Sequence, residues 1–265
     1  MTEKTFRLVR QGLDLRFRRA ILAERTWLTD AYVRVRLRGD DLVGFDSPGC
    51  DDHMRLFFPG GPGGATAWAG SSEELRAQPS REYTPLAWAE DRLDVEFAVH
   101  GPPGARGVAA EWAASAPLGS VVGVGGPRGS MLLEGVPDAW LLAGDETAVP
   151  AIRRFAAAMP HDAVGRILVE VTDAAHELAL SAPAGVRVDH VHRGGAPGGS
   201  ALAARLDALT AEDRPRGDVF AFIAAEQSVV RTGRALAVER WGLDPERIVV
   251  KGYWKSGETE FHAPH

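Results

Sequence analysis

The segment Arg81-Glu82-Tyr83-Thr84 combines a fixed positive charge, an aromatic ring and a hydroxyl within four residues. In an extended strand Arg81 and Tyr83 point to the same side, because successive side chains alternate between the two faces. Such a pair can hold a diphosphate through charge-assisted hydrogen bonds while the ring packs on a flat heterocycle. A plain strand with a surface arginine and a core tyrosine is the alternative interpretation.

Two glycine-containing segments can offer backbone N–H groups to a phosphate. His100-Gly101 leads to Gly107–Trp112, where a glycine turn enters a predicted helix and leaves the positive end of the helix dipole open. Gly125–Ser130 follows a predicted strand, and Arg128 adds a positive charge to its glycines. An ordinary helix cap and an ordinary connector remain the alternatives for these two segments.

Two more segments with this potential lie in the second half of the chain. Gly144–Pro150 follows an apolar strand and resembles the strand–glycine–helix turn where a nicotinamide dinucleotide docks, although it lacks the full glycine fingerprint. Thr147 or Asp145 can instead be a simple helix N-cap. Lys251–Gly257 places adjacent aromatic residues beside a cation after the last predicted strand. These aromatics either line a ligand cleft or anchor the end of the chain on the core.

The elements that must position these residues change in kind along the chain. Tyr32–Arg38 alternates apolar residues with arginines, the period of a half-buried strand. Six short strands separated by glycine and proline indicate an antiparallel barrel or sandwich, interrupted by one helix near Val108–Ala116. The predicted strands are Arg18–Arg25, Tyr32–Arg38, His53–Phe58, Arg81–Trp88, Arg92–His100 and Ser120–Val124.

After Pro137, apolar strands alternate with amphipathic helices, which indicates a parallel sheet covered on both faces. The predicted strands are Ala139–Ala143, Arg166–Val171, Val186–His192, Asp218–Ala224 and Arg247–Tyr253, and the predicted helices are Thr147–Met159, Ser200–Leu209 and Gln227–Trp241. We therefore expect two domains, residues 1–136 and residues 137–265. Ligands of open α/β sheets bind at the carboxyl ends of the strands.

Composition narrows the possible partners and compartments. The 265 residues are 45% hydrophobic and carry a formal net charge of -6, which argues against nucleic acid as the main partner. A single cysteine, Cys50, cannot form a disulfide framework within the chain and favours a reducing compartment. No apolar stretch has the length of a signal peptide or a membrane span. We therefore expect a cytoplasmic protein without membrane insertion.

In order, Arg81–Thr84, His100–Trp112, Gly126–Ser130, Gly144–Pro150 and Gly252–Gly257 resemble the siderophore-interacting proteins, a branch of the ferredoxin-NADP reductase superfamily. The resemblance extends from the first barrel strand to about residue 257. It implies a flavin-binding six-stranded antiparallel β-barrel followed by an α/β nucleotide-binding domain. It also implies FAD as cofactor and NAD(P)H as electron donor.

The resemblance also assigns roles to individual residues. Arg81 would contact the FAD phosphate, Tyr83 and Thr84 the isoalloxazine or its linker, and Gly144–Thr147 the reduced nicotinamide. A basic substrate set would attract an anionic ferric siderophore. The implied cofactor-binding residues are Arg81, Tyr83, Thr84, His100, Gly107, Val108, Ala109, Trp112, Gly144, Asp145, Glu146 and Thr147, and the implied substrate-binding residues are Arg55, Arg128 and Lys255.

This sequence departs from the family pattern in three places. His53-Met54-Arg55-Leu56 has arginine where the family usually has lysine, and Pro85-Leu86 follows Thr84 where many relatives have a further arginine. The chain stops at His265, whereas many relatives continue into a C-terminal helix. That difference leaves reduced ferredoxin as an alternative donor.

The function implied is therefore reduction of a ferric siderophore, with release of Fe(II). We name no general acid or base, and the scattered histidines do not show the spacing of a metal site. A general flavin or ferredoxin-type reductase and a non-catalytic siderophore-binding protein are the two competing functions.

Overall fold

The computed structural model describes residues 6–258 and residue 261. The chain separates into two compact units, one formed by Arg10–Met131 and the other by the residues that precede and follow that segment. The expected domain boundary between residues 136 and 137 remains a proposal. Every helix in the described part of the chain is too short or too polar to traverse a bilayer.

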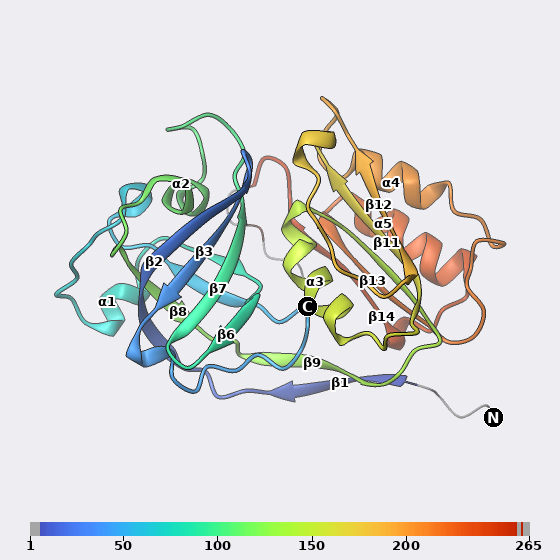
Figure 1. Cartoon of the computed structure of the whole chain (residues 1–265), viewed down its shortest axis with the longest axis horizontal. Coiled ribbons are helices and arrows are strands. Elements are labelled where there is room, and N and C mark those ends of the chain that lie inside the picture. Colours follow the sequence, from blue (N-terminus) through green and yellow to red (C-terminus); the bar gives the residue numbers. More distant parts are fainter. Residues whose placement is uncertain (1–5, 259–260, 262–265) are drawn as a thin grey trace. The chain divides into compact units, whose positions relative to one another are not determined.

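The Arg10–Met131 unit is built on a curled antiparallel sheet (Figure 1). Its strands lie in the order β5-β4-β8-β2-β3-β7-β6. Inward-facing apolar side chains of several strands pack with helix α2 in one core, which includes Leu22, Val35, Leu56, Phe97 and Trp112. The elements are β2 (Phe17–Thr29), β3 (Tyr32–Arg38), η1 (Asp40–Leu42), β4 (Met54–Phe57), η2 (Gly61–Gly63), α1 (Ser72–Arg76), β5 (Ser80–Tyr83), β6 (Ala87–Ala89), β7 (Arg92–Ala98), α2 (Val108–Ser115) and β8 (Val121–Gly125).

This sheet has seven strands where the sequence predicts six. The strand expected over Arg81–Trp88 is in fact two strands, β5 and β6, which lie at opposite edges of the sheet. Pro85 lies in the break, and proline has no N–H group to continue a strand ladder. The other five predicted strands are confirmed, with ends that differ by up to a few residues.

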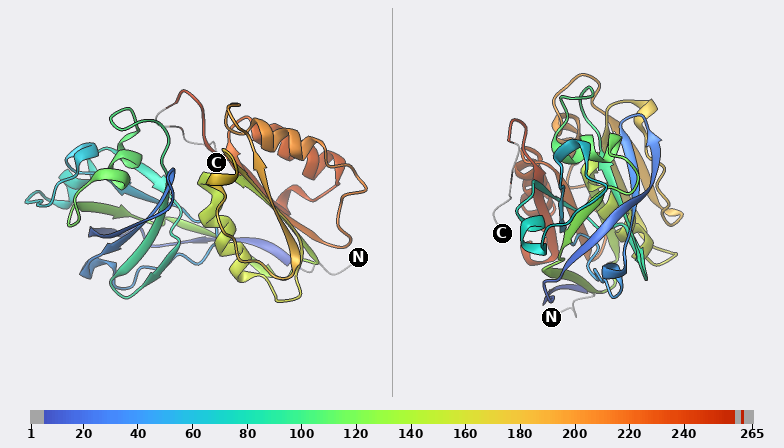
Figure 2. Two further views of the ribbon diagram at one scale, coloured as in Figure 1. Left: turned by 45° about the horizontal axis from the view of Figure 1, so that its top comes forward. Right: turned by 90° about the vertical axis from the view of Figure 1, so that its left-hand side faces the viewer.

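The second unit contains a five-stranded parallel sheet in the order β12-β11-β10-β13-β14. Phe155 of α3 packs on Phe220 and Phe222 of β13, while Leu202 of α4 and Leu236, which follows α5, belong to the core on the opposite face. Figure 2 shows these helices on either side of the sheet. The elements are β10 (Ala139–Asp145), η3 (Glu146–Ala148), α3 (Val149–Ala158), β11 (Val164–Val171), η4 (Ala174–His176), β12 (Gly185–His192), α4 (Ser200–Asp207), β13 (Val219–Glu226), α5 (Val229–Arg234), η5 (Ala235–Arg240), η6 (Pro245–Arg247) and β14 (Ile248–Trp254).

The order of these strands locates the expected binding edge. Chain connections leave β10 first toward β11 and later reach β13 on its other side, so the strand order reverses next to β10. In open α/β sheets, ligands bind beyond the carboxyl ends of the strands at such a reversal. The carboxyl ends of β10 and β13 are Asp145 and Glu226.

The sequence did not predict a separate two-stranded sheet, β1 (Phe6–Gly12) paired with β9 (Gly129–Gly135). The first residues of β9 belong to the glycine-rich segment Gly125–Ser130, which was interpreted as a connector or a ligand loop. Glycines at both ends of β9 mask the strand pattern, because glycine is rare in strands. The short helix α1 was also not predicted.

Candidate functional site

The structure brings the Arg81–Thr84 segment and helix α2 together. Helix α2 contacts β5, the edge strand that carries Arg81 and Tyr83. The ring of Tyr83 lies 4.2 Å from that of Phe97, whose ring in turn lies 6.4 Å from that of Trp112 in α2. Two segments that were separate motifs in the sequence therefore pack on one core of the Arg10–Met131 unit, with Tyr83 partly buried against it.

At the N-terminus of α2, backbone N–H groups have no hydrogen-bond partner among residues 6–258. Gly107 is the N-cap, and no side chain in that range caps the helix. The first helical hydrogen bond runs from the Glu111 N–H to the Gly107 carbonyl, at 3.0 Å, so the N–H groups of Val108 and Ala109 lie ahead of the hydrogen-bonded ladder. A Cβ atom added at Gly107 would meet no atom within 4 Å. This end of the helix can bind a phosphate.

The other predicted cofactor residues of this unit have different environments. Arg81 is half-buried and its Nη1 donates to the Ser80 carbonyl, at 2.7 Å, while Thr84 is buried at the end of the strand. His100 is exposed just after β7, which also contacts α2. Trp112 is fully buried, so its ring packs helix α2 onto the core of the unit.

An arginine from β2 holds the opposite end of helix α2. Arg25 Nε donates to the Ala113 carbonyl at 2.5 Å, and its Nη2 donates to the Ala116 carbonyl at 2.6 Å. A cation at the C-terminus of a helix satisfies its last carbonyls and interacts favourably with the helix dipole. Burial lowers the pKa of Arg25 from its ordinary value, and a guanidinium stays protonated in proteins. No local pattern in the sequence signals this contact, because Arg25 and the two alanines are 88 or more residues apart.

The three predicted substrate-binding cations are not equivalent. Arg55 pairs in register with Gly125, and its guanidinium forms an ion pair with Glu82 at 2.8 Å that offsets part of its charge. Arg128 is exposed and has no ion pair among the described residues. Lys255 belongs to the other unit and forms an ion pair with Glu258.

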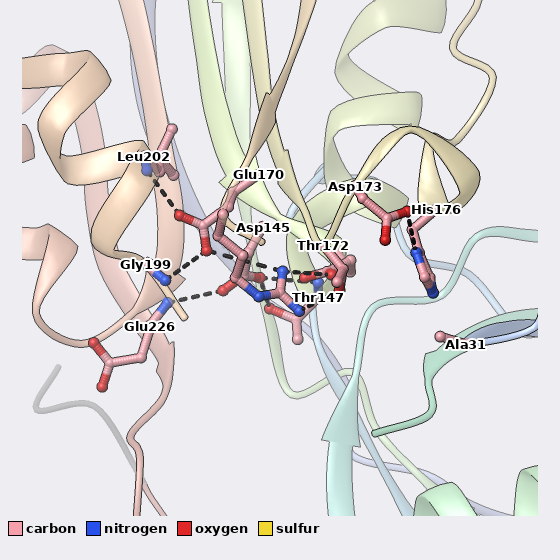
Figure 3. Close-up of polar contacts among 12 residues, drawn as sticks. Ala31, Asp145, Thr147, Glu170, Thr172, Asp173, His176, Gly199, Leu202 and Glu226 are labelled. Atoms are coloured by element: carbon pink, nitrogen blue, oxygen red, sulfur yellow. Dashed lines mark hydrogen bonds and ion pairs between the residues drawn. The ribbon is translucent and has the colours of Figure 1, made fainter. Parts of the chain in front are cut away.

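At the carboxyl edge of the parallel sheet, Asp145 is the centre of a hydrogen-bond network (Figure 3). Its carboxylate accepts bonds from the Thr147 N–H at 2.9 Å, the Glu226 N–H at 3.0 Å and the Trp254 indole N–H at 2.7 Å. Burial raises the pKa of Asp145, and the bonds from Thr147 and Trp254 act in the opposite direction. The side chain of Asp145 therefore ties together the ends of three strands.

The same network explains the Gly144 turn and the aromatic residues near the C-terminus. A Cβ atom at Gly144 would lie 2.5 Å from the Ala148 Cβ and 2.7 Å from the Ala224 carbonyl oxygen, so only glycine allows this close approach. Trp254 anchors the end of β14 on Asp145, which favours the anchoring interpretation of the Lys251–Gly257 segment.

Two residues of this edge were missing from the predicted site. Glu170 is fully buried in β11 and accepts the backbone N–H groups of Gly199 and Leu202, at 2.6 and 2.7 Å, at the start of α4 (Figure 3). Arg193 donates to Glu146 at 2.7 Å and to the Thr172 hydroxyl at 2.9 Å. The available signal was a glutamate within an apolar run of a parallel strand, where a charge needs buried partners.

Nothing in the ranges that the structure describes assembles three or more acidic, histidine or cysteine side chains into a metal site.

Comparisons with known proteins agree with this architecture. The model of the siderophore-interacting FAD-binding domain matches residues 22–131, and the model of the siderophore-interacting protein matches residues 137–257. The chain belongs to the siderophore-interacting protein family. Among the relatives of this family member, the NADPH-dependent ferric-chelate reductase of Escherichia coli is 33% identical over 255 residues, which are 91% of this chain and 94% of the relative.

Other relatives of this siderophore-interacting protein differ in coverage. The ferric vibriobactin reductase of Vibrio cholerae is 29% identical and covers 88% of each chain. A siderophore utilization protein from T. fusca has a solved structure with a TM-score of 0.80 and 31% identity, covering 95% of this chain and 97% of its own. The chain spans 62% of the length of a Mycobacterium tuberculosis relative that is 36% identical over 180 residues.

The FAD-binding model and the geometry concern the same unit. The backbone N–H groups at Gly107–Ala109 and the cation of Arg81, whose strand contacts α2, suit a diphosphate. The Tyr83 ring on the same edge strand is only partly buried against the core and suits a flat heterocycle. These residues therefore fit FAD.

Proposed function

We propose that this protein is an FAD-dependent oxidoreductase that reduces ferric siderophores in the cytoplasm and releases the iron as Fe(II), with electrons from NAD(P)H. The observation that carries the proposal is the contact of the edge strand that bears Arg81 and Tyr83 with helix α2, whose N-terminus no side chain caps among the described residues, inside the unit that matches an FAD-binding domain. The names of the Escherichia coli and Vibrio cholerae relatives, both ferric reductases, support the reaction.

In this proposal the first unit binds and orients the flavin. Arg81 and the N–H groups of Gly107, Val108 and Ala109 bind the diphosphate, and His100 completes that site. Tyr83 and Thr84 contact the isoalloxazine, while Trp112 supports α2 from the core. FAD supplies the link between two-electron chemistry of a nicotinamide and one-electron chemistry of iron, which amino-acid side chains do not provide.

The second unit supplies the donor site in this proposal. Backbone groups of Gly144, Asp145, Glu146 and Thr147 line the nicotinamide site at the carboxyl edge of the sheet. Because the Asp145 carboxylate is occupied by internal donors, it acts as a positioning residue that holds the Gly144 turn.

The basic side chains attract the substrate. Ferric complexes of catecholate and hydroxycarboxylate siderophores are anionic, so Arg55, Arg128 and Lys255 would raise their local concentration even on a protein with a net charge of -6. Hard oxygen donors hold Fe(II) less strongly than Fe(III), so reduction loosens the metal from its chelator. The protein itself needs to move no proton in this step.

Anaerobic mixing tests the whole proposal. The purified protein should show flavin absorbance, lose that absorbance on addition of NADH or NADPH, and regain it when a ferric siderophore is added together with a dye that traps Fe(II). Reduction only by reduced ferredoxin would identify the alternative donor. Faster turnover of free flavin or cytochrome-like acceptors than of ferric siderophores would identify a general reductase. A colourless protein that binds no added FAD would contradict the proposal.

The Tyr83 ring provides a residue-level test of the flavin site. Tyr83→Ala should weaken FAD binding by roughly 2- to 10-fold, because an aromatic contact contributes about 0.5–1.5 kcal/mol beyond its buried area. Flavin content after gel filtration and titration of the apoprotein with FAD measure the change. Tyr83→Phe, which keeps the ring, is the matched control and should stay near wild type. Full flavin loading of a folded Tyr83→Ala protein would remove Tyr83 from the site.

A further inference from the structure

A cavity of about 190 Å³ opens at the start of strand β2. Its lining includes Arg16, just before β2, Arg18 within β2, the Gly126–Pro127 turn after β8, and the exposed residues Asp14 and Asp46. Its volume is more than ten times the roughly 15 Å³ that one water molecule needs. All of these residues belong to the Arg10–Met131 unit, and of them only Gly126 and Pro127 lie in a segment that the sequence offered as a possible ligand loop.

Arg18 is a buried cation for which the described part of the chain provides no ionic partner. Only 6% of the residue is exposed, and its guanidinium lies 5.2 Å from the centre of the Phe45 ring. Its Nη1 donates to the Gly126 carbonyl at 3.2 Å and approaches the Arg16 carbonyl at 3.5 Å. Within residues 6–258, no carboxylate forms an ion pair with Arg18, and no acceptor bonds its Nε or Nη2. Three of its five N–H groups can therefore donate hydrogen bonds to a ligand in the cavity.

The charges around the cavity leave this cation incompletely compensated. Burial lowers the pKa of Arg18, the nearby charge of Arg16 lowers it further, and Asp41 only partly offsets these effects. The Asp41 carboxylate also accepts the backbone N–H of Arg19, at 3.0 Å. A buried charge without a counter-ion is unfavourable, and an oxyanion beside Arg18 would relieve that cost.

The planar shape of the guanidinium and the charges that line the cavity indicate which anions can bind there. A planar guanidinium matches the two oxygens of a carboxylate, and two parallel N–H···O bonds add both strength and orientation. Asp14 and Asp46 line the cavity as well, and Asp46 already accepts the Ser47 N–H at 2.9 Å. Their negative charges disfavour a multiply charged anion such as phosphate.

We propose that this cavity is a binding site for a small monocarboxylate, held by Arg18 at its base and assisted by Arg16 at its rim. The site does not depend on the flavin or on the ferric substrate, so it goes beyond the proposed function. It shares the Gly126–Pro127 turn with the segment that carries Arg128, which places a bound carboxylate next to that segment.

The test uses the full-length protein and acetate as the probe. Arg18 Nε–H is observed by ¹⁵N NMR during titration with sodium acetate, with sodium chloride added in place of acetate at the same ionic strength. Loss of one signal in Arg18→Lys assigns the resonance. We expect a saturable shift of the Arg18 signal with acetate, a weaker effect with phosphate and none with chloride. Equal shifts with acetate and chloride would overturn the proposal.

Two exposed arginines on the same segment provide the matched pair of variants. Arg16→Gln should weaken acetate binding by roughly 2- to 5-fold, since one exposed charge contributes about 0.4–1 kcal/mol. Arg19 follows Arg18 on the opposite face of the strand and donates to the Trp68 carbonyl at 2.9 Å, so Arg19→Gln should leave the affinity unchanged. An equal loss in both variants would show a nonspecific surface charge effect and overturn the site. Because neither side chain is in the core, this comparison remains valid even if Arg18→Lys does not fold.

Discussion

Replacing Arg25 by methionine removes the cation that holds the C-terminal end of helix α2. The side chain is half-buried, and methionine preserves much of its length and apolar contact while leaving two carbonyl groups without their donors. The flavin diphosphate is proposed to bind at the other end of this helix. A loosened α2 should therefore reduce stability and FAD affinity together.

The contacts in the structure set the size of the effect. Two short hydrogen bonds, to Ala113 and Ala116, involve a charged donor. Such bonds contribute about 1.5–3 kcal/mol each, and the lower value applies because water can reach part of the site. Arg25→Met should therefore cost roughly 3 kcal/mol, which is about a 1 M decrease in the urea midpoint at a slope near 3 kcal/mol/M.

Urea unfolding followed by circular dichroism measures the stability, and titration of the apoprotein with FAD measures the affinity. Arg25→Lys should give an intermediate loss, because it keeps the charge but not the planar fork. Arg38→Met is the matched control. Arg38 of the same sheet forms an ion pair with Asp91, and both side chains are nearly half exposed, at 46% and 44%. The decrease in unfolding free energy should therefore stay below about 1 kcal/mol. If Arg25→Met unfolds at the wild-type midpoint, or loses no more than Arg38→Met, the proposed support of α2 is wrong.

Three further results are expected. The double variant Arg55→Ala/Arg128→Ala should raise the apparent KM for an anionic ferric siderophore by roughly tenfold at low salt and less at high salt, and an unchanged KM would exclude the basic set. Trp254→Phe leaves the buried Asp145 carboxylate without one donor and should lower the unfolding free energy by about 1–3 kcal/mol. Trp241→Phe, the control, loses a bond to a neutral carbonyl and should lower it less. A larger loss of unfolding free energy in Trp241→Phe than in Trp254→Phe would contradict the network. Burial opposes ionisation of Glu226, but hydrogen bonds bring its pKa below the usual value, so its ionised form stabilises the fold above about pH 4.5 and that contribution disappears as the pH falls through the lowered pKa. Urea midpoints of Glu226→Gln should accordingly approach those of wild type in acid, and a difference that does not depend on pH would refute the assignment.

Local pattern was sufficient for most elements of the fold. The alternation in Tyr32–Arg38 predicted β3 with its observed ends, and the apolar runs after Pro137 predicted all five parallel strands. These patterns predict strands because a strand with one buried face needs alternating apolar residues, and a strand with two buried faces needs a continuous apolar run. The interpretation of Arg81–Trp88 as one strand failed because the residues on both sides of Pro85 have strand character, while hydrogen bonding to different neighbours decides where each strand ends.

The sequence by itself determined the order of the two folds and the family to which its motifs point. Tertiary structure alone decided which side chains meet. Trp254 reaches Asp145 across 109 residues. Of the three arginines Arg16, Arg18 and Arg19, only Arg18 is buried, beside a cavity. Sequence spacing predicts the face of a strand on which a residue lies, but burial and partners depend on chain segments brought together only when the sheet curls and the helices pack.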